Sequence, residues 1–115
     1  MKKLVLTLVL LVFASSLLAT TVTECCSHIA ALRVATQGAT FHGKNGEVDR
    51  ANLIGKLDVA QIKLNQAKLA DAVQKLTDFR DKVSTLSTTG KIDAEDAAAL
   101  IAGANDAILC IQTLG

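Results

Sequence analysis

The sequence predicts an all-α protein, namely an antiparallel four-helix bundle made of two similar helical hairpins and preceded by an N-terminal signal helix. Three observations predict this class. Alanine, leucine, isoleucine and valine dominate a chain of 115 residues that contains no proline, which favours helix over strand. Apolar residues recur at helical spacing. A pattern of residues also repeats after 44 positions, and Gly46 and Gly90 are its clearest members.

The start of the chain has the pattern of a secretory leader. Lys2 and Lys3 give it a positive start, and residues 4–13 are apolar apart from one threonine. Residues 14–21 are small or mildly apolar, as the end of a leader usually is. We therefore expect residues 1–20 to be a signal peptide.

A retained membrane anchor is the alternative to cleavage. The apolar stretch 4–19 has 16 residues, fewer than the roughly 20 that a membrane-spanning helix needs. This length favours removal of the leader, which leaves a helical domain over residues 21–115. Cleavage is expected after Ser16, Ala19 or Thr21.

The charge of the mature domain is close to neutral. Removing Lys2 and Lys3 from the 12 basic residues leaves 10, against 11 acidic ones. No basic surface for nucleic acid or for anionic lipid is expected from this balance. We therefore expect no nucleic-acid partner, and no membrane association after the signal is cleaved.

Two stretches of the chain match each other when one is shifted by 44 residues. The glycine-x-aliphatic-aspartate pattern of residues 46–49 recurs at residues 90–93, and the apolar positions that follow keep the same spacing. Chance similarity between two amphipathic helices is the alternative, but both flanking helices hold the register. The matched positions are Leu53, Leu57, Ala60 and Leu64 with Ala97, Ile101, Ala104 and Ile108.

Each half therefore predicts a helix, a glycine-containing loop and a second helix. The first helix is expected over residues 27–37, with Gly38 ending it, and the second from Asp49 as N-cap to residue 66. The third is expected over residues 68–86. The fourth is expected from Asp93 as N-cap to residue 113. Val48 and Ile92 precede these caps, where each could close over the helix as a hydrophobic staple. The expected core residues are Leu53, Leu57, Leu76, Phe79, Ile101 and Ile108.

All three cysteines follow the leader, where oxidation is expected after export. In an up-down-up-down bundle, the start of the first helix and the end of the fourth lie at the same end. This arrangement predicts a disulfide from Cys110 to either Cys25 or Cys26. Closing a loop of over 80 residues would stabilise the fold by roughly 4 kcal/mol in the chain-entropy model. The third cysteine is either free or joins two chains.

No metal, cofactor or catalytic site is expected. The cysteines together with His28 could ligate zinc, but their spacing is not that of a usual zinc module. The loops before Asp49 and Asp93 lack the carboxylates of a calcium-binding EF-hand, and His42 is expected to be solvated. No histidine accompanies a nucleophile and an orienting group, so an enzyme is the disfavoured class.

Most of the mature chain resembles the FIMAH domain. The resemblance lies in residues 57–60 (LDVA), 72–79 (AVQKLTDF), 90–97 (GKIDAEDA) and 100–104 (LIAGA). It implies a compact helical module of secreted or surface-attached bacterial and archaeal hydrolases and adhesive proteins, which assists attachment or binding without catalysing a reaction. The sequence departs from that family because the module stands alone behind a leader and carries three cysteines.

The expected function is that of an exported, non-catalytic helical binding or interaction module, secreted, periplasmic or at the cell surface. Its partner would be an unknown protein or a second copy of the chain. One alternative is a structural subunit of a surface assembly, which the spare cysteine and the alanine-rich residues 94–107 suggest. The other alternative is a secreted inhibitor of an extracellular enzyme.

Overall fold

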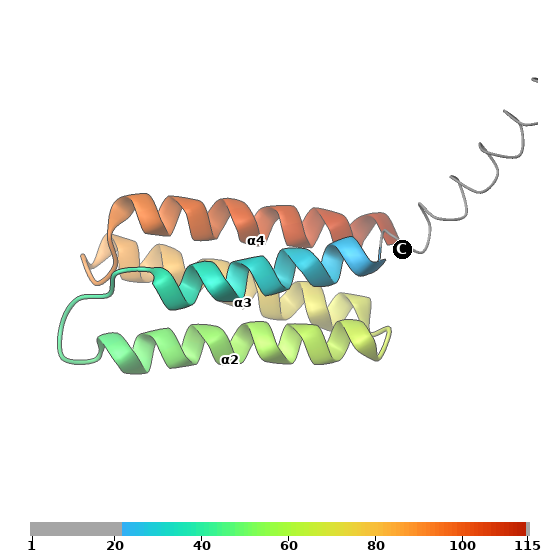
Figure 1. The fold of residues 1–115 in the computed structure, drawn as a ribbon, viewed down its shortest axis with the longest axis horizontal. Coiled ribbons are helices and arrows are strands. Elements are labelled where there is room, and N and C mark those ends of the chain that lie inside the picture. The colour runs from blue at the N-terminus through green and yellow to red at the C-terminus, as the bar shows by residue number, and fades with distance from the viewer. Residues whose placement is uncertain (1–21, 115) are drawn as a thin grey trace, which may run out of the picture.

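Four helices packed side by side make up the protein in its computed structural model, which describes residues 22–114 (Figure 1). Residues 22–38 are helical, and they are followed by α2 (Gly46–Asn65), α3 (Leu69–Thr88) and α4 (Ala94–Leu114). The described residues contain no strand, only an isolated antiparallel bridge between Phe41 and Ile92. The predicted all-α class is confirmed over this part of the chain. The signal peptide, expected over residues 1–20, lies outside it.

Each helix packs beside the next one in the sequence. Helix α2 packs against α3, and α3 packs against α4. The helical segment 22–38 contacts α2 through an ion pair between Arg33 and Asp58, and it is joined to α4 by a disulfide. Residues 22 and 114 therefore lie at one end of the bundle, and the two longer connections meet at the other end (Figure 1).

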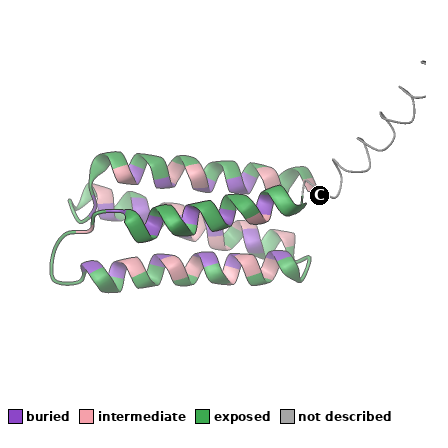
Figure 2. Cartoon of the chain, viewed as in Figure 1, coloured by how far each residue is buried: buried purple, intermediate pink, exposed green. Residues whose placement is uncertain are grey.

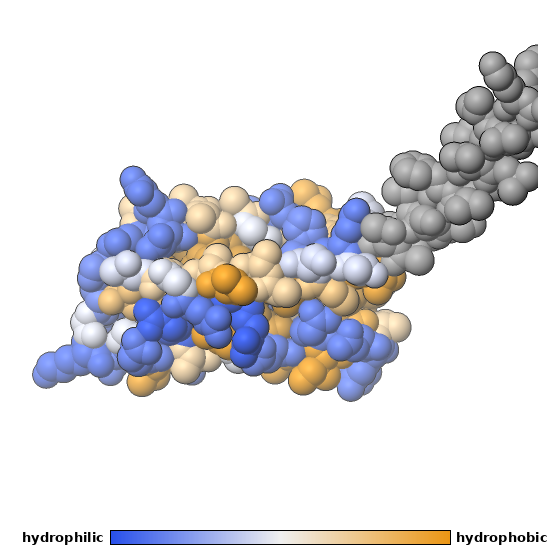
Figure 3. All heavy atoms as spheres, viewed as in Figure 1, coloured by the Kyte–Doolittle hydropathy of each residue, from blue (hydrophilic) through white to orange (hydrophobic). Residues whose placement is uncertain are grey.

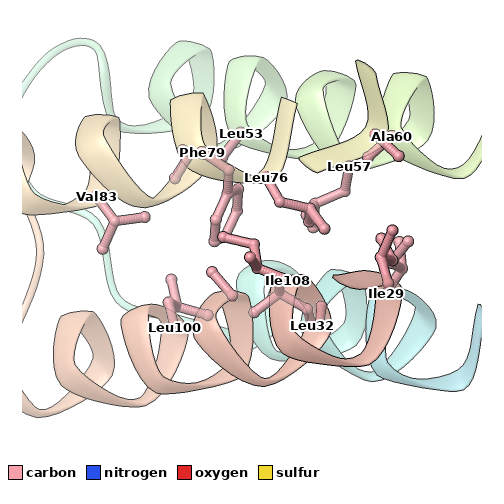
Figure 4. Packing of buried hydrophobic residues seen from close by; sticks show 14 of the residues in the cluster. Ile29, Leu32, Leu53, Leu57, Ala60, Leu76, Phe79, Val83, Leu100 and Ile108 are labelled. Carbon is pink, nitrogen blue, oxygen red and sulfur yellow. The ribbon is translucent and has the colours of Figure 1, made fainter. Parts of the chain in front are cut away.

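The core is one continuous cluster to which all four helices contribute, so that purple, buried positions follow the inner side of each helix (Figure 2). Phe79 lies near its middle, with Leu53 and Leu76 beside it (Figure 4). Of the six expected core residues, five are buried and Ile101 is partly buried against the cluster. A buried threonine, Thr36, satisfies its hydroxyl by donating a hydrogen bond to the carbonyl oxygen of Leu32 at 2.7 Å.

The predicted start of the second helix is wrong. Asp49 is not the N-cap, because α2 begins three residues earlier at Gly46 and is preceded by Asn45. Gly46 is buried against Phe41, where a Cβ would lie 3.3 Å from the Phe41 Cβ. Asp49 therefore lies in the first turn of the helix and is buried in line with Leu53. Val48 is 58% exposed and does not act as a staple.

The start of the fourth helix was placed correctly. Asp93 directly precedes α4, and its carbonyl oxygen accepts a hydrogen bond from the amide of Ala97 at 2.9 Å. Ile92 and Ala97 are both buried. The two glycine motifs thus form different structures, because Gly46 opens a helix whereas Gly90 has a φ of +72° and lies after the end of α3.

Candidate functional site: the face of residues 22–38 and α4

A disulfide between Cys25 and Cys110 joins the first and last helices across 85 positions of sequence, with the two Cα atoms 5.5 Å apart. Successive residues of a helix point about 100° apart, so the neighbouring cysteine faces another helix. The Cys26 sulfur instead accepts a hydrogen bond from Gln61 of α2 at 3.2 Å. Cys26 is a free, partly buried thiol. The helical register of these two residues thus decides which cysteine pairs with Cys110.

The same two helices approach closely at Gly103 of α4. A Cβ at this position would lie 2.9 Å from the Leu32 Cδ1 atom, closer than real Cβ contacts allow. Leu32 is buried, and its side chain would have to shift if residue 103 carried a Cβ atom. The missing side chain of Gly103 therefore permits the close packing of residues 22–38 on α4.

The outward side of this helix pair is apolar. Val34 is 67% exposed and Leu109 is 60% exposed, and both lie on the side of their helices away from the core. Figure 3 shows apolar residues along the middle of this face, between hydrophilic ones. We call this surface the α4 face. Its exposed small residues are Ala30, Ala31, Ala35, Ala98, Ala99 and Ala102.

Polar side chains at the edges of the α4 face are directed toward the neighbouring helices. Arg33 donates to Asp58 of α2 at 2.9 Å, and Arg80 of α3 donates to Asn105 at 2.9 Å. These contacts involve Arg33 and Asn105, whereas Glu24, His28 and Asp106 stay exposed beside Leu109. The alanines and the two large apolar side chains are left facing solvent.

A shallow, open groove of about 400 Å³ lies beside the disulfide at one end of the α4 face. Glu24 and His28 come from the first helix, and the other lining residues come from α4. These are Asp106, Leu109, Cys110 and Thr113. A second, more apolar hollow of about 560 Å³ lies at the end of the bundle, between Val22, Leu64, Leu69 and Leu114.

The two longer connections are tied together at the opposite end. The amide of Thr40 donates to the Asp96 carboxylate at 2.9 Å, and the amide of His42 donates to the carbonyl oxygen of Lys91 at 2.8 Å. The His42 Nε2 atom lies 2.5 Å from the Asp93 carboxylate. His42 is exposed to solvent, as expected, and its contact with Asp93 also links the two loops.

The residues considered as zinc ligands do not form a cluster in the described part of the chain. No three histidine, cysteine, aspartate or glutamate side chains lie close enough there to hold a metal ion. Cys25 and Cys110 are joined to each other, and the Cys26 sulfur contacts Gln61. The positions of the three cysteines are therefore explained by helix packing and by the disulfide.

Helix α4 has a composition that allows two interpretations. It is the one helix among residues 22–114 that is long and apolar enough to cross a membrane, although the core helix of a soluble protein can meet the same criteria. Six of its residues are buried in the bundle. Its apolar character therefore reflects both the core and the exposed alanines of the α4 face.

Comparison with protein-family models, with curated proteins and with solved structures gives no match to the chain. The resemblance to the FIMAH domain stays a prediction. Hypotheses about function therefore rest on the surfaces described above.

The α4 face is not among the features predicted from the sequence, although the sequence contains a signal for it. Val34 and Leu109 are large apolar residues at positions opposite the buried stripe of their helices. A helix that only packs against a core carries polar residues at such positions. Two apolar exceptions on neighbouring helices could have indicated a binding surface.

Proposed function

We propose that the chain is an exported, non-catalytic helical interaction module that binds a protein partner through the α4 face. The observation that carries this proposal is the exposure of Val34 and Leu109 on adjacent helices that also expose several alanines, with Glu24, His28 and Asp106 beside Leu109. Exposed apolar surface of this kind is a feature of protein-protein contact sites. The predicted leader and the disulfide support a location outside the cytoplasm, whether secreted, periplasmic or at the cell surface.

We further infer that the bundle is antiparallel and consists of two similar hairpins. Short connections between consecutive helices support this arrangement. The two hairpins differ in detail, since Ala35 is exposed whereas its counterpart Phe79 is fully buried. The resemblance to the FIMAH domain agrees with a role in attachment.

The proposal predicts that a natural partner is lost when the α4 face is altered. The test captures proteins from the native envelope with the tagged, oxidised protein and with the variant Val34→Glu/Leu109→Glu. The control variant Val48→Glu/Ile62→Glu alters two residues of α2 that are 58% and 52% exposed. A protein enriched by the wild type and by the control, but not by the α4-face variant, would support the proposal. Equal enrichment by all three, or none by any, would contradict it.

A structural subunit of a larger assembly is the second candidate. The exposed alanines of α4 favour it, because small side chains permit close packing between copies. Native mass at several protein concentrations separates the two candidates. A discrete monomer or dimer agrees with an interaction module, whereas open-ended growth agrees with an assembly subunit.

A further inference from the structure

The groove beside the disulfide has two walls of similar chemistry. One wall is formed by Glu24 and His28, which lie one turn apart on the first helix, and the other by Asp106 and Leu109 on α4. Each wall therefore presents an exposed carboxylate, and Leu109 adds an exposed apolar side chain. Neither carboxylate has a hydrogen bond or an ion pair to another residue of the described part of the chain.

The distribution of charge around this groove is one-sided. Helix α4 carries three acidic residues and no lysine, arginine or histidine. In the first helix, the guanidinium of Arg33 is drawn to Asp58 of α2. His28 is the one basic side chain that lines the groove. All lysines among residues 22–114 lie in α2, in α3 or in the connections, namely Lys44, Lys56, Lys63, Lys68, Lys75, Lys82 and Lys91.

The walls of the groove are also fixed relative to each other. Cys110 lines the groove and Cys25 is buried in the first helix, and their disulfide prevents the two helices from separating at this point. A site that is already in its binding geometry loses less conformational entropy when a ligand enters. The position of the covalent link at this groove therefore favours binding as well as stability.

We propose that this groove binds a cationic amphipathic helix of the partner protein. A lysine or arginine of that helix would lie between Glu24 and Asp106, and an apolar side chain one turn away would pack on Leu109. This inference rests on the proposed function and names the chemistry of the partner at one end of the α4 face. Helix-in-groove binding with anchors at helical spacing is a known mode of peptide recognition.

The probe for the test is a fluorescein-labelled helical peptide that carries lysine on one face and leucine on the other. Its control replaces each lysine with glutamate. Fluorescence anisotropy is measured during titration with the oxidised protein. The variant Glu24→Gln/Asp106→Asn should weaken binding of the lysine peptide roughly five- to tenfold, since exposed ion pairs contribute little individually. Reduction of the disulfide should weaken binding as well, while circular dichroism reports whether the helices persist.

The control variant Asp71→Asn/Asp81→Asn removes the same charge from α3 and should leave binding unchanged. Equal affinity for the lysine and glutamate peptides, or wild-type binding by the groove variant, would overturn the proposal. A control variant that weakens binding as much as the groove variant would show attraction by overall charge and would also overturn it. Because the peptide test does not involve the natural partner, it can fail while the capture test of the α4 face succeeds.

Discussion

At the scale of single residues, the ends of α2 and α3 use the same hydrogen-bonding motif with different residues. After α3, the amide of Gly90 donates to the carbonyl of Ser87, and that of Lys91 to the carbonyl of Leu86. After α2, Ala67 and Lys68 make the corresponding bonds, to Leu64 and Lys63. This pair of bonds defines a Schellman motif, whose residue with positive φ is usually glycine. Ala67 has a φ of +60° and therefore carries a steric cost that Gly90 avoids.

These two positions predict opposite effects of exchanging glycine and alanine. Ala67→Gly should raise the free energy of unfolding by about 1 kcal/mol, because it relieves the left-handed conformation. Gly90→Ala should lower it by about 1 kcal/mol for the same reason. Chemical denaturation followed by circular dichroism measures both changes. A loss of stability in Ala67→Gly would show that the alanine side chain contributes packing that outweighs its backbone cost.

Gly55 in α2 and Gly103 in α4 form a second pair for comparison, and both lie inside helices. A Cβ at Gly55 would meet nothing within 4 Å, whereas one at Gly103 would collide with Leu32. Gly55→Ala should therefore raise the free energy of unfolding by about 0.5–1 kcal/mol through helix propensity alone. Gly103→Ala should lose this gain and lower stability, because the buried leucine must shift. Equal stabilisation by both substitutions in a denaturation experiment would refute the close approach of the two helices.

At the scale of elements, the two longer connections are held by polar contacts in addition to the burial of Ala39 and Ile92 in the core. Thr40 and His42 in one connection bond to Asp96 and Asp93 near the start of α4. These bonds bring together residues more than 50 positions apart, so the loops order each other. The long loop 39–45 is therefore fixed to the end of the bundle.

The contribution of this loop contact can be measured against a neighbouring residue. Asp96→Ala should lower the free energy of unfolding by about 1 kcal/mol, because the Thr40 amide loses its acceptor and the first turn loses a negative charge. Glu95→Ala removes only the charge in the same turn and should cost about 0.5 kcal/mol. Amide exchange at Thr40 should accelerate in the first variant alone. Unchanged exchange at Thr40 would contradict the contact.

The elements show which parts of the fold the sequence can predict. The bounds of α3 and α4 follow from regular apolar spacing, and they differ from the predicted bounds by two residues at most. The start of α2 was missed because the buried stripe begins with a charged residue, Asp49, and because Gly46 packs on Phe41. Such contacts join residues that become neighbours through the path of the loop. The spacing of apolar residues carries no information on that path.

Only the disulfide end of the candidate site was predicted from the sequence. There, the positions of the cysteines and the geometry of a helical bundle together bring the residues close to each other. The disulfide end was anticipated from the topology, but the choice of Cys25 depends on the rotation of the first helix about its axis. The α4 face was missed because it consists of residues from two helices that adjoin only in the folded protein. Leu109 on its own is an ordinary exposed leucine, and it becomes part of a surface through its neighbours.

At the scale of the whole molecule, the disulfide closes the described chain into one covalent loop between its first and last helices. Cys110→Ser should lower the free energy of unfolding by about 4 kcal/mol, because the unfolded chain regains the freedom that a crosslink of this span removes. Cys26→Ser should change it by less than about 1 kcal/mol, since this sulfur is only partly buried. Denaturation under non-reducing conditions compares the two variants with the wild type. Similar losses in both would contradict the assigned pairing.

The predicted export would explain how the disulfide forms. The leader would bring the chain to an oxidising compartment, where Cys25 and Cys110 would join and fix the two helices that carry the α4 face. The same crosslink would thus serve both stability and the proposed binding. This link between location, closure and surface is the central claim of the account.

Mass spectrometry of the natural protein, isolated without reduction, tests this claim most directly. Thiols are first blocked by alkylation, and the intact mass and the crosslinked peptides are then measured. The account predicts a chain without its leader, one disulfide between Cys25 and Cys110, and an alkylated Cys26. A chain that retains residues 1–20, or one that carries three alkylated cysteines, would contradict it.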